Sequence, residues 1–153
     1  GSVCEQLPFT NVISLEAVQS FGAGGGTPLG EAVNLALQKL ETRKKEYQKN
    51  GVAYYQPWLI IISDGEPTDA WQHAASQSQK LSASRKLVSV PIGVAGANLN
   101  ILSQFSSRPA KALDGLKFEQ FFEWLSASMS RVSASASTSS GVQLPPTDSW
   151  ESI

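Results

Sequence analysis

The chain has 153 residues, of which 41% are hydrophobic and 16% charged, so it can bury one hydrophobic core but hardly two. The 12 Lys and Arg against 13 Asp and Glu give a net charge of −1, which argues against binding to a nucleic acid. No stretch reaches the roughly 18 apolar residues that a membrane-spanning helix needs. With one cysteine, Cys4, and one histidine, His73, the chain has neither an internal disulfide nor a four-ligand Cys/His zinc site. The low cysteine count favours a reducing, cytoplasmic compartment, with Cys4 as a small buried side chain.

The start of the chain predicts a short strand and a short helix. It opens with Gly1-Ser2 and no initiator Met, so we expect a cleavage scar or a chain cut from a longer one. Residues 3–7, which end at Pro8, predict an edge strand. Apolar residues at positions 15, 18 and 21 have helical spacing, and the small residues 22–26 that follow predict a loop.

The clearest predicted helix begins after this loop. Thr27 is the expected N-cap, with Pro28 at the first helical position and Glu31 in the first turn. The apolar residues of its core face recur at intervals of three and four: Leu29, Ala32, Val33, Ala36, Leu37 and Leu40. Asn50-Gly51 marks the expected end of the helix.

The next segments predict strands alternating with helices. Residues 57–63 are continuously apolar, which is typical of a central parallel strand covered on both faces. A polar helix at 70–83, a strand at 86–94 limited in its pairing by Pro91, a short helix capped by Asn98 and a short strand at 110–113 follow. A last amphipathic helix has a largely aromatic apolar face, made of Phe118, Phe121, Phe122, Leu125 and Met129. The order predicts an α/β fold with an open, mostly parallel, Rossmann-like sheet flanked by helices.

The chain divides into three parts by composition. Residues 1–132 form the predicted domain, and residues 133–141, almost only Ser, Ala and Thr, predict a flexible linker. Residues 142–153 include apolar side chains such as Trp150. This closing segment either docks on the domain or stays free.

Two segments are expected to lie beyond the carboxyl ends of the strands, where open α/β sheets bind ligands. One is Gly24-Gly25-Gly26-Thr27-Pro28, and the other is Ser63-Asp64-Gly65. The hydroxyl of Thr27 and the carboxylate of Asp64 are hard oxygen ligands that suit Mg²⁺ or Mn²⁺. The plainer alternative is that Thr27 is only a helix cap and Asp64 only a turn residue.

The combination resembles a von Willebrand factor type A (vWA) domain. Gly26-Thr27-Pro28-Leu29-Gly30, followed by residues 58–69 (Trp-Leu-Ile-Ile-Ile-Ser-Asp-Gly-Glu-Pro-Thr-Asp), looks like the second and third ligand loops of that family. Residues 54–58, 67–72 and 121–126 are similar to bacterial TerY-like proteins associated with tellurium resistance and stress. The resemblance runs from about residue 3 to residue 150.

The resemblance implies a metal-ion-dependent adhesion site (MIDAS) with Thr27 and Asp64 as ligands of Mg²⁺ or Mn²⁺. The family's first loop, Asp-x-Ser-x-Ser, is absent, so the first two strands and the first helix are expected to be missing. We expect the C-terminal part of a larger domain, or a domain whose N-terminal half comes from another chain. The apolar edge of residues 57–63 would then be exposed, and metal binding by this chain alone would be weak or absent.

Three functions follow as hypotheses. The first is a non-enzymatic module that binds an acidic residue of a partner protein through the metal, with a rim of five residues: Gly26, Gly65, Glu66, Thr68 and Asp69. The second is a metal-independent interaction domain that presents Tyr54, Tyr55 and Trp71. The third is a metal-assisted hydrolase. It lacks an evident catalytic base, because the one histidine, His73, is predicted to be a surface residue.

Overall fold

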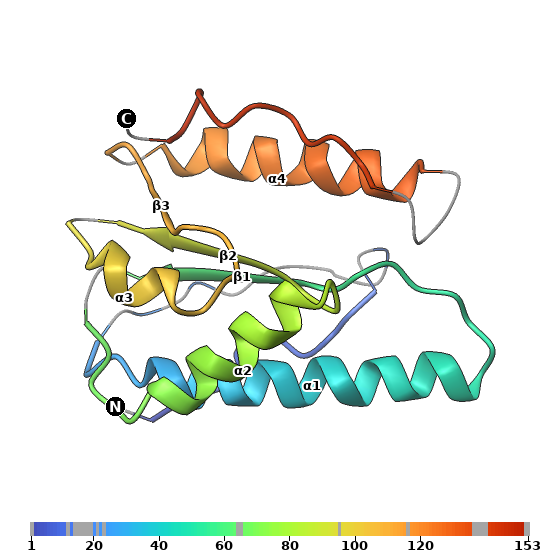
Figure 1. The fold of residues 1–153 in the computed structure, drawn as a ribbon, viewed down its shortest axis with the longest axis horizontal. Helices are drawn as coiled ribbons and strands as arrows, with labels where there is room; N and C mark the ends of the chain where they lie inside the picture. Colours follow the sequence, from blue (N-terminus) through green and yellow to red (C-terminus); the bar gives the residue numbers. More distant parts are fainter. Residues whose placement is uncertain are drawn as a thin grey trace.

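The computed structural model describes residues 2–11, 13, 20, 22, 24–63, 66–94, 96–115, 117–135 and 141–151. In chain order these form α1 (Leu29–Lys49), β1 (Trp58–Ser63), α2 (Gln72–Ala83), β2 (Val88–Gly93), α3 (Leu99–Ser103), β3 (Lys111–Ala112) and α4 (Phe118–Ser133). The strands form a parallel sheet with α1, α2 and α3 on one face and α4 on the other (Figure 1). This arrangement confirms the α/β class with an open parallel sheet. No helix within the described ranges is long and apolar enough to cross a bilayer.

β1 is buried from both sides, as its apolar sequence predicts. Leu59 and Ile61 belong to the core shared with α1, α2 and α3, while Trp58 and Ile60 pack with the core under α4. The alternation follows the two-residue period of a strand. The prediction that this strand is central is wrong, because β2 lies in the middle of the sheet and β1 pairs, within the described part, only with β2. In the described part of the chain, β1 is therefore an edge strand.

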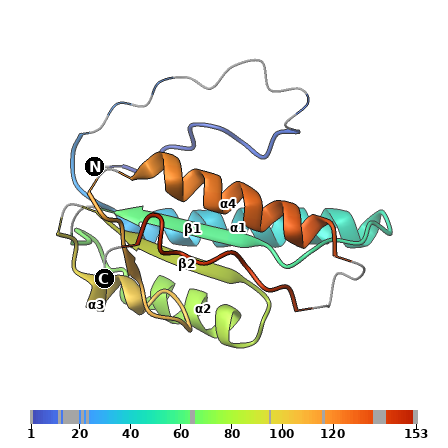
Figure 2. The ribbon, with the colours of Figure 1, turned by 90° about the horizontal axis from the view of Figure 1, so that it is seen from above.

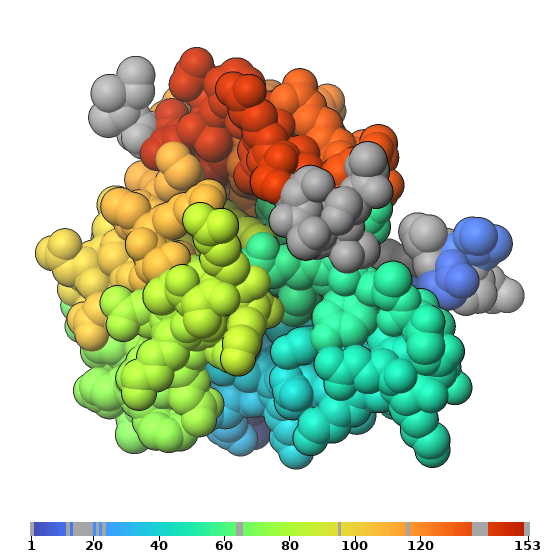
Figure 3. Space-filling model, turned by 45° about the vertical axis from the view of Figure 1, so that its right-hand side comes forward, coloured from blue at the N-terminus to red at the C-terminus, as the bar shows by residue number. Residues whose placement is uncertain are grey.

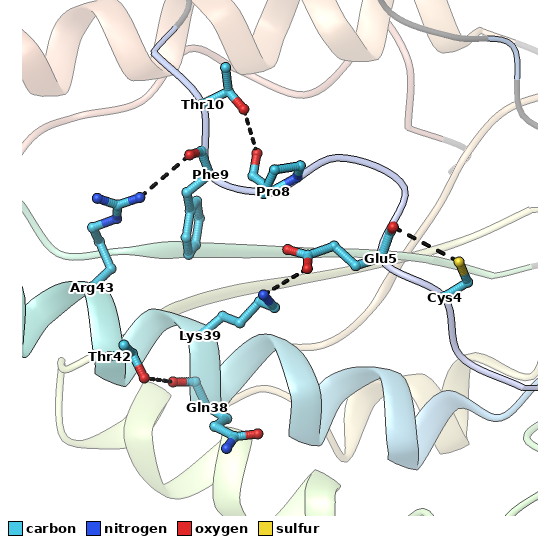
Figure 4. A network of polar contacts seen from close by, with 9 residues as sticks. All are labelled: Cys4, Glu5, Pro8, Phe9, Thr10, Gln38, Lys39, Thr42 and Arg43. Carbon is cyan, nitrogen blue, oxygen red and sulfur yellow. Dashed lines mark hydrogen bonds and ion pairs between the residues drawn. The ribbon is translucent and has the colours of Figure 1, made fainter.

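Residues 2–11 form no strand, so the edge strand predicted for residues 3–7 is also wrong. This segment lies along α1 and is held by polar contacts (Figure 4). Glu5 forms an ion pair with Lys39 at 2.7 Å, and Arg43 donates a hydrogen bond to the carbonyl oxygen of Phe9 at 3.4 Å. Cys4 is exposed, which corrects the expectation that it is buried. The helix predicted around residues 15–21 lies outside the described residues.

α1 begins and ends close to the predicted positions, but its cap differs. The capping residue is Pro28, which offers no side-chain cap, so the expectation that Thr27 is the N-cap is wrong. At the other end Asn50 is the C-cap and Gly51 has a φ of +64°, the left-handed conformation that glycine adopts without strain. The buried face is the predicted one, with Leu29 and Val33 in the core.

The later elements follow the predicted order. Asn98 caps α3, since its Oδ1 accepts a hydrogen bond from the backbone N–H of Ile101 at 3.3 Å. β2 pairs with β1 over its whole length, Pro91 included, but with β3 only at Ile92 and Gly93. The pairing with β3 thus starts just after the proline, which has no N–H to donate.

The closing segment docks on α4 and the sheet. Trp150 is 0% exposed, and its ring centroid lies 5.0 Å from that of Phe121 and 5.3 Å from that of Trp124. The indole N–H of Trp124 donates to the carbonyl oxygen of Pro145 at 2.9 Å. Seen from above, the closing segment runs beside α4 (Figure 2), and in the space-filling view its atoms adjoin those of α4 (Figure 3). Residues 136–140 of the predicted linker lie outside the described part.

The end of the closing segment is fixed to β3. Glu151 forms an isolated antiparallel bridge with Leu113, and its carboxylate contacts the ammonium of Lys111 and the hydroxyl of Thr147. Burial alone would raise the pKa of Glu151, but the hydrogen bonds from Lys111 and Thr147 and the Lys111 charge outweigh it. The pKa of Glu151 therefore lies below its ordinary value, and the carboxylate stays charged against Lys111.

Candidate functional site

The start of α1 and the loop after β1 meet at the carboxyl end of the sheet. The backbone N–H of Thr68 donates to the carbonyl oxygen of Thr27 at 2.9 Å. Thr27 is half-buried, while Gly26, Glu66 and Thr68 are exposed. The two loops that the sequence singles out are therefore joined directly, at the place where open α/β sheets bind ligands.

Asp69 caps α1 from the other loop. Its Oδ1 accepts a hydrogen bond from the N–H of Gly30 at 3.1 Å, and its Oδ2 accepts one from the N–H of Glu31 at 2.8 Å. These are two of the N–H groups that the first turn of a helix leaves without a partner, and a carboxylate there also suits the helix dipole. Asp69 thus provides the side-chain cap of α1 that Pro28 lacks.

Two glycines allow this close approach. A Cβ atom on Gly30 would lie 2.6 Å from the Cα of Trp71 and 3.1 Å from Oδ2 of Asp69. A Cβ on Gly26 would lie 2.9 Å from Oγ1 of Thr68. The missing side chains let the backbone of α1 and the loop after β1 touch.

A third loop joins the cluster through Glu66. Its Oε1 accepts a hydrogen bond from Nδ2 of Asn98 at 2.9 Å. Asn98 uses its other side-chain atom, Oδ1, to cap α3. One amide therefore connects the loop after β1 to the helix that follows β2.

The structure brings together most of the residues predicted for the site. Gly26, Thr27, Thr68 and Asp69 form one contiguous cluster, and Glu66 turns toward Asn98. Asp64 and Gly65 lie outside the described residues, directly after the last residue of β1. Among the residues described, no group of three or more His, Cys, Asp or Glu side chains is placed to hold a metal ion.

Of the residues in the competing hypotheses, Trp71 borders the loop cluster at Gly30, and His73, Tyr54 and Tyr55 are not among its contacts described above. His73 is exposed near the start of α2. The ring of Trp71 packs 5.8 Å from that of Phe105, and the ring of Tyr54 lies 5.9 Å from that of Tyr47. Tyr55 donates its hydroxyl to the carbonyl oxygen of Ser133 at the end of α4. Trp71 and Tyr54 thus make ring contacts within the chain, and Tyr55 makes a hydrogen bond.

Reading the sequence missed three contributors: Asp69 as the cap of α1, Gly30 as the point of contact, and Asn98 as the partner of Glu66. Asp69 and Gly30 are 39 residues apart, so no local capping pattern connects them. The available signal is Gly30 itself, because a glycine in the first turn of a good helix often marks a close approach.

We expect Asp69→Ala to destabilise the start of α1. Both hydrogen bonds would be lost, at a cost of about 1–2 kcal/mol, as for other helix caps. Hydrogen exchange followed by NMR should show faster exchange at the amides of Gly30 and Glu31. Asp148→Ala, which removes an exposed carboxylate from the closing segment, is the control and should leave both rates unchanged. Equal exchange rates in the Asp69→Ala variant and the parent chain would contradict the capping role.

Comparison with known proteins identifies the family of the chain. The profile of the von Willebrand factor type A domain matches residues 8–124, which is more than half of the chain. No curated protein and no solved structure gives a significant match. The matched range includes all the loops of the cluster described above, together with the sheet that carries them. The chain therefore belongs to the von Willebrand factor type A domain family.

Proposed function

We propose that the chain is a non-enzymatic protein-interaction module that binds a partner through a divalent cation at the loop cluster. The observation that carries the proposal is the 2.9 Å hydrogen bond from Thr68 to Thr27. It brings the hydroxyl-bearing residue at the start of α1 beside the loop that contains Asp64. Family membership supports a role in protein interaction.

The available donors suit Mg²⁺ or Mn²⁺ rather than a softer metal. Thr27, Glu66 and Thr68 offer oxygen atoms, which hard cations prefer, and Asp64 would add a carboxylate. The carboxylate of Asp69 is occupied by the amides of Gly30 and Glu31, so we assign it the role of holding the loops. Because the protein offers few ligands, water would complete the coordination of the cation. The residues therefore suit an open, weak metal site rather than a closed one.

The cation would supply a positive centre for an acidic residue of the partner protein. The residues around it would set the contact surface: Gly26, Glu66 and Thr68 are exposed, and Gly65 belongs to the same loop. Glu66 is oriented by Asn98, which limits the positions that its carboxylate adopts. The wider setting we propose, a cytoplasmic bacterial stress or tellurium-resistance system, is supported by the TerY-like sequence segments alone.

Isothermal calorimetry with Mg²⁺ and Mn²⁺ tests the proposal. We expect weak binding by the chain and at least a tenfold loss of affinity in Thr27→Ala and in Asp64→Ala, because each removes an oxygen ligand. Thr42→Ala is the matched control, since it removes the same group from an exposed position within α1. Equal affinity in all variants, or no binding even by a chain extended at its N-terminus to include the family's first loop, would contradict the metal site and leave an interaction domain that works without it.

A further inference from the structure

We propose that a basic surface at the carboxyl end of α2 docks an acidic segment of a partner protein. This surface, the basic end, consists of five exposed residues: Lys45, Lys80, Arg85, Lys86 and Arg108. α2 begins beside the loop cluster and runs away from it (Figure 1), and its 12 residues span about 18 Å. The basic end therefore lies apart from the metal site, and the proposal does not depend on that site.

Charges of opposite sign gather at the two ends of α2. Residues 70–113 contain no Asp or Glu but hold five basic residues: Lys80, Arg85, Lys86, Arg108 and Lys111. The loop cluster at the other end of the helix carries Glu31, Glu66 and Asp69. Salt limits the reach of exposed charges to about 10 Å, so the basic end attracts anions although the net charge of the chain is −1.

Ion pairs within the chain do not neutralise the basic end. All 12 Lys and Arg lie in the described residues, and five of them form ion pairs: Lys39, Arg43, Lys44, Lys111 and Lys117. None of these five belongs to the basic end. Within the part of the chain that the structure describes, the charges of the basic end are thus available to an external anion.

The end of α2 is joined to the segment before β3. The hydroxyl oxygens of Ser82 and Ser107 lie 2.8 Å apart, and the backbone N–H of Ser107 donates to Oγ of Ser82 at 3.3 Å. Arg108 follows Ser107 directly and is exposed. Arg108 therefore belongs to the same surface as the basic residues at the end of α2.

α1 contributes Lys45 to this surface. The pKa of Glu41 in α1 lies below its ordinary value, first because Lys44 donates a hydrogen bond to its carboxylate and lies beside it. The charges of Lys45 and of Lys86, which follows α2, lower this pKa further, while burial opposes the shift. Both ammonium groups therefore lie near the same point of α1. Because Glu41 is already paired with Lys44 at 2.9 Å, it does not neutralise them.

Arg85 occupies a position at which glycine is usual. It follows Ser84, the C-cap of α2, and its φ of +56° is in the left-handed region, where a side chain strains the backbone. The same position after α1 is taken by Gly51, with a φ of +64°. A positive charge for the helix dipole is already supplied by Lys80 in the last turn of α2. Such strain is typical of functional positions, which supports a binding role for the arginine side chain.

Protein carboxylates suit this surface better than nucleic acid or lipid. Arg85 and Arg108 can each bind a carboxylate through two parallel N–H groups. A nucleic-acid strand needs exposed aromatic rings on which its bases stack, and a membrane surface needs an exposed apolar face. The described residues between 66 and 115 include no exposed large apolar side chain, and Phe105, near Arg108, is 0% exposed. The surface therefore offers charge without an apolar face.

Fluorescence anisotropy with a labelled peptide of alternating Asp and Gly residues tests the proposal on the unmodified chain. We expect binding that weakens as salt is added, because the attraction is between exposed charges. The matched peptide with Asn in place of Asp should not bind. In NMR spectra the amides of residues 80–86 and 106–108 should shift on titration with the acidic peptide, whereas those of the loop cluster should not.

Two substitutions remove charge from the basic end. Arg85→Gly and Arg108→Gln should each weaken peptide binding at least threefold, and the double variant at least tenfold. Arg85→Gly should also unfold at a higher urea concentration than the parent chain, because glycine relieves the strain at a φ of +56°. Weaker binding by a more stable protein separates docking from folding. Lys117→Gln, at the start of α4, is the control and should leave binding unchanged.

Three results with the acidic peptide would overturn the proposal: no binding, equal affinity of the double variant and the parent chain, or shifts centred outside the basic end. Tighter binding of a single-stranded oligonucleotide, or of phosphatidylcholine vesicles that contain phosphatidylglycerol, would also overturn it, since the ligand would then be a nucleic acid or a membrane. So would a lower urea midpoint for Arg85→Gly, because the arginine would then serve the fold.

Discussion

Trp150→Ala should cost the chain about 3–5 kcal/mol of unfolding free energy, as for other buried aromatic residues truncated to alanine. Trp150 is fully buried and its ring contacts those of Phe121 and Trp124, so its loss leaves a large cavity under α4. The substitution also removes the main anchor of the closing segment. Urea unfolding followed by circular dichroism measures the effect.

Two variants serve as references for this result. Trp150→Phe keeps an aromatic ring in the site and should lose less stability than the alanine variant. Phe9→Ala removes an aromatic side chain that is 52% exposed and lies under Arg43, and should cost less than about 1 kcal/mol. If Trp150→Ala unfolds at the same urea concentration as Phe9→Ala, the closing segment is not part of the folded core.

Gly30→Val should damage the loop cluster and the fold together. The new Cβ would lie 2.6 Å from the backbone of Trp71, which cannot move aside as a flexible side chain can. We expect a loss of about 3 kcal/mol, at the upper end of the usual cost of overpacking. Because the loop after β1 must shift, the hydrogen bonds of Asp69 to Gly30 and Glu31 should be lost as well.

Gly24→Val is the matched control for Gly30→Val. A Cβ on Gly24 has no atom within 4 Å, so the substitution should change stability by less than about 0.5 kcal/mol. Urea unfolding gives the stability of both variants, and the exchange rates of the Gly30 and Glu31 amides report on the cap. Equal stability of Gly24→Val and Gly30→Val would show that α1 and the loop are not in close contact.

Much of the fold could be predicted because its elements have strong local patterns. α1 has a clear apolar face, β1 is continuously apolar and α4 carries an aromatic face, and each forms close to its predicted range. The position of β1 in the sheet could not be predicted from its own residues, and an exposed edge was expected only because the family's first loop is absent. An apolar sequence shows that both faces are covered, but it does not show whether both edges are paired.

The residues of the site could be predicted better than their roles. The joined loops at Thr27 and Thr68 follow from the rule that ligands bind beyond the carboxyl ends of the strands. The sequence predicts Thr27 as the cap of α1 because capping residues normally stand next to their helix. The fold instead supplies Asp69 from a distant loop, and only the close approach at Gly30 makes that contact possible.

Mapping the position of a bound metal tests the proposed function most directly. Mn²⁺ is paramagnetic and broadens the NMR signals of nearby amides, so substoichiometric Mn²⁺ added to the labelled chain reports where it binds. We expect the amides of Gly26, Thr27, Glu66 and Thr68 to broaden first, with α4 and residues 141–151 unaffected. Broadening centred on Glu151 or on another surface carboxylate, or uniform broadening without a centre, would contradict a metal-dependent interaction site at the loop cluster.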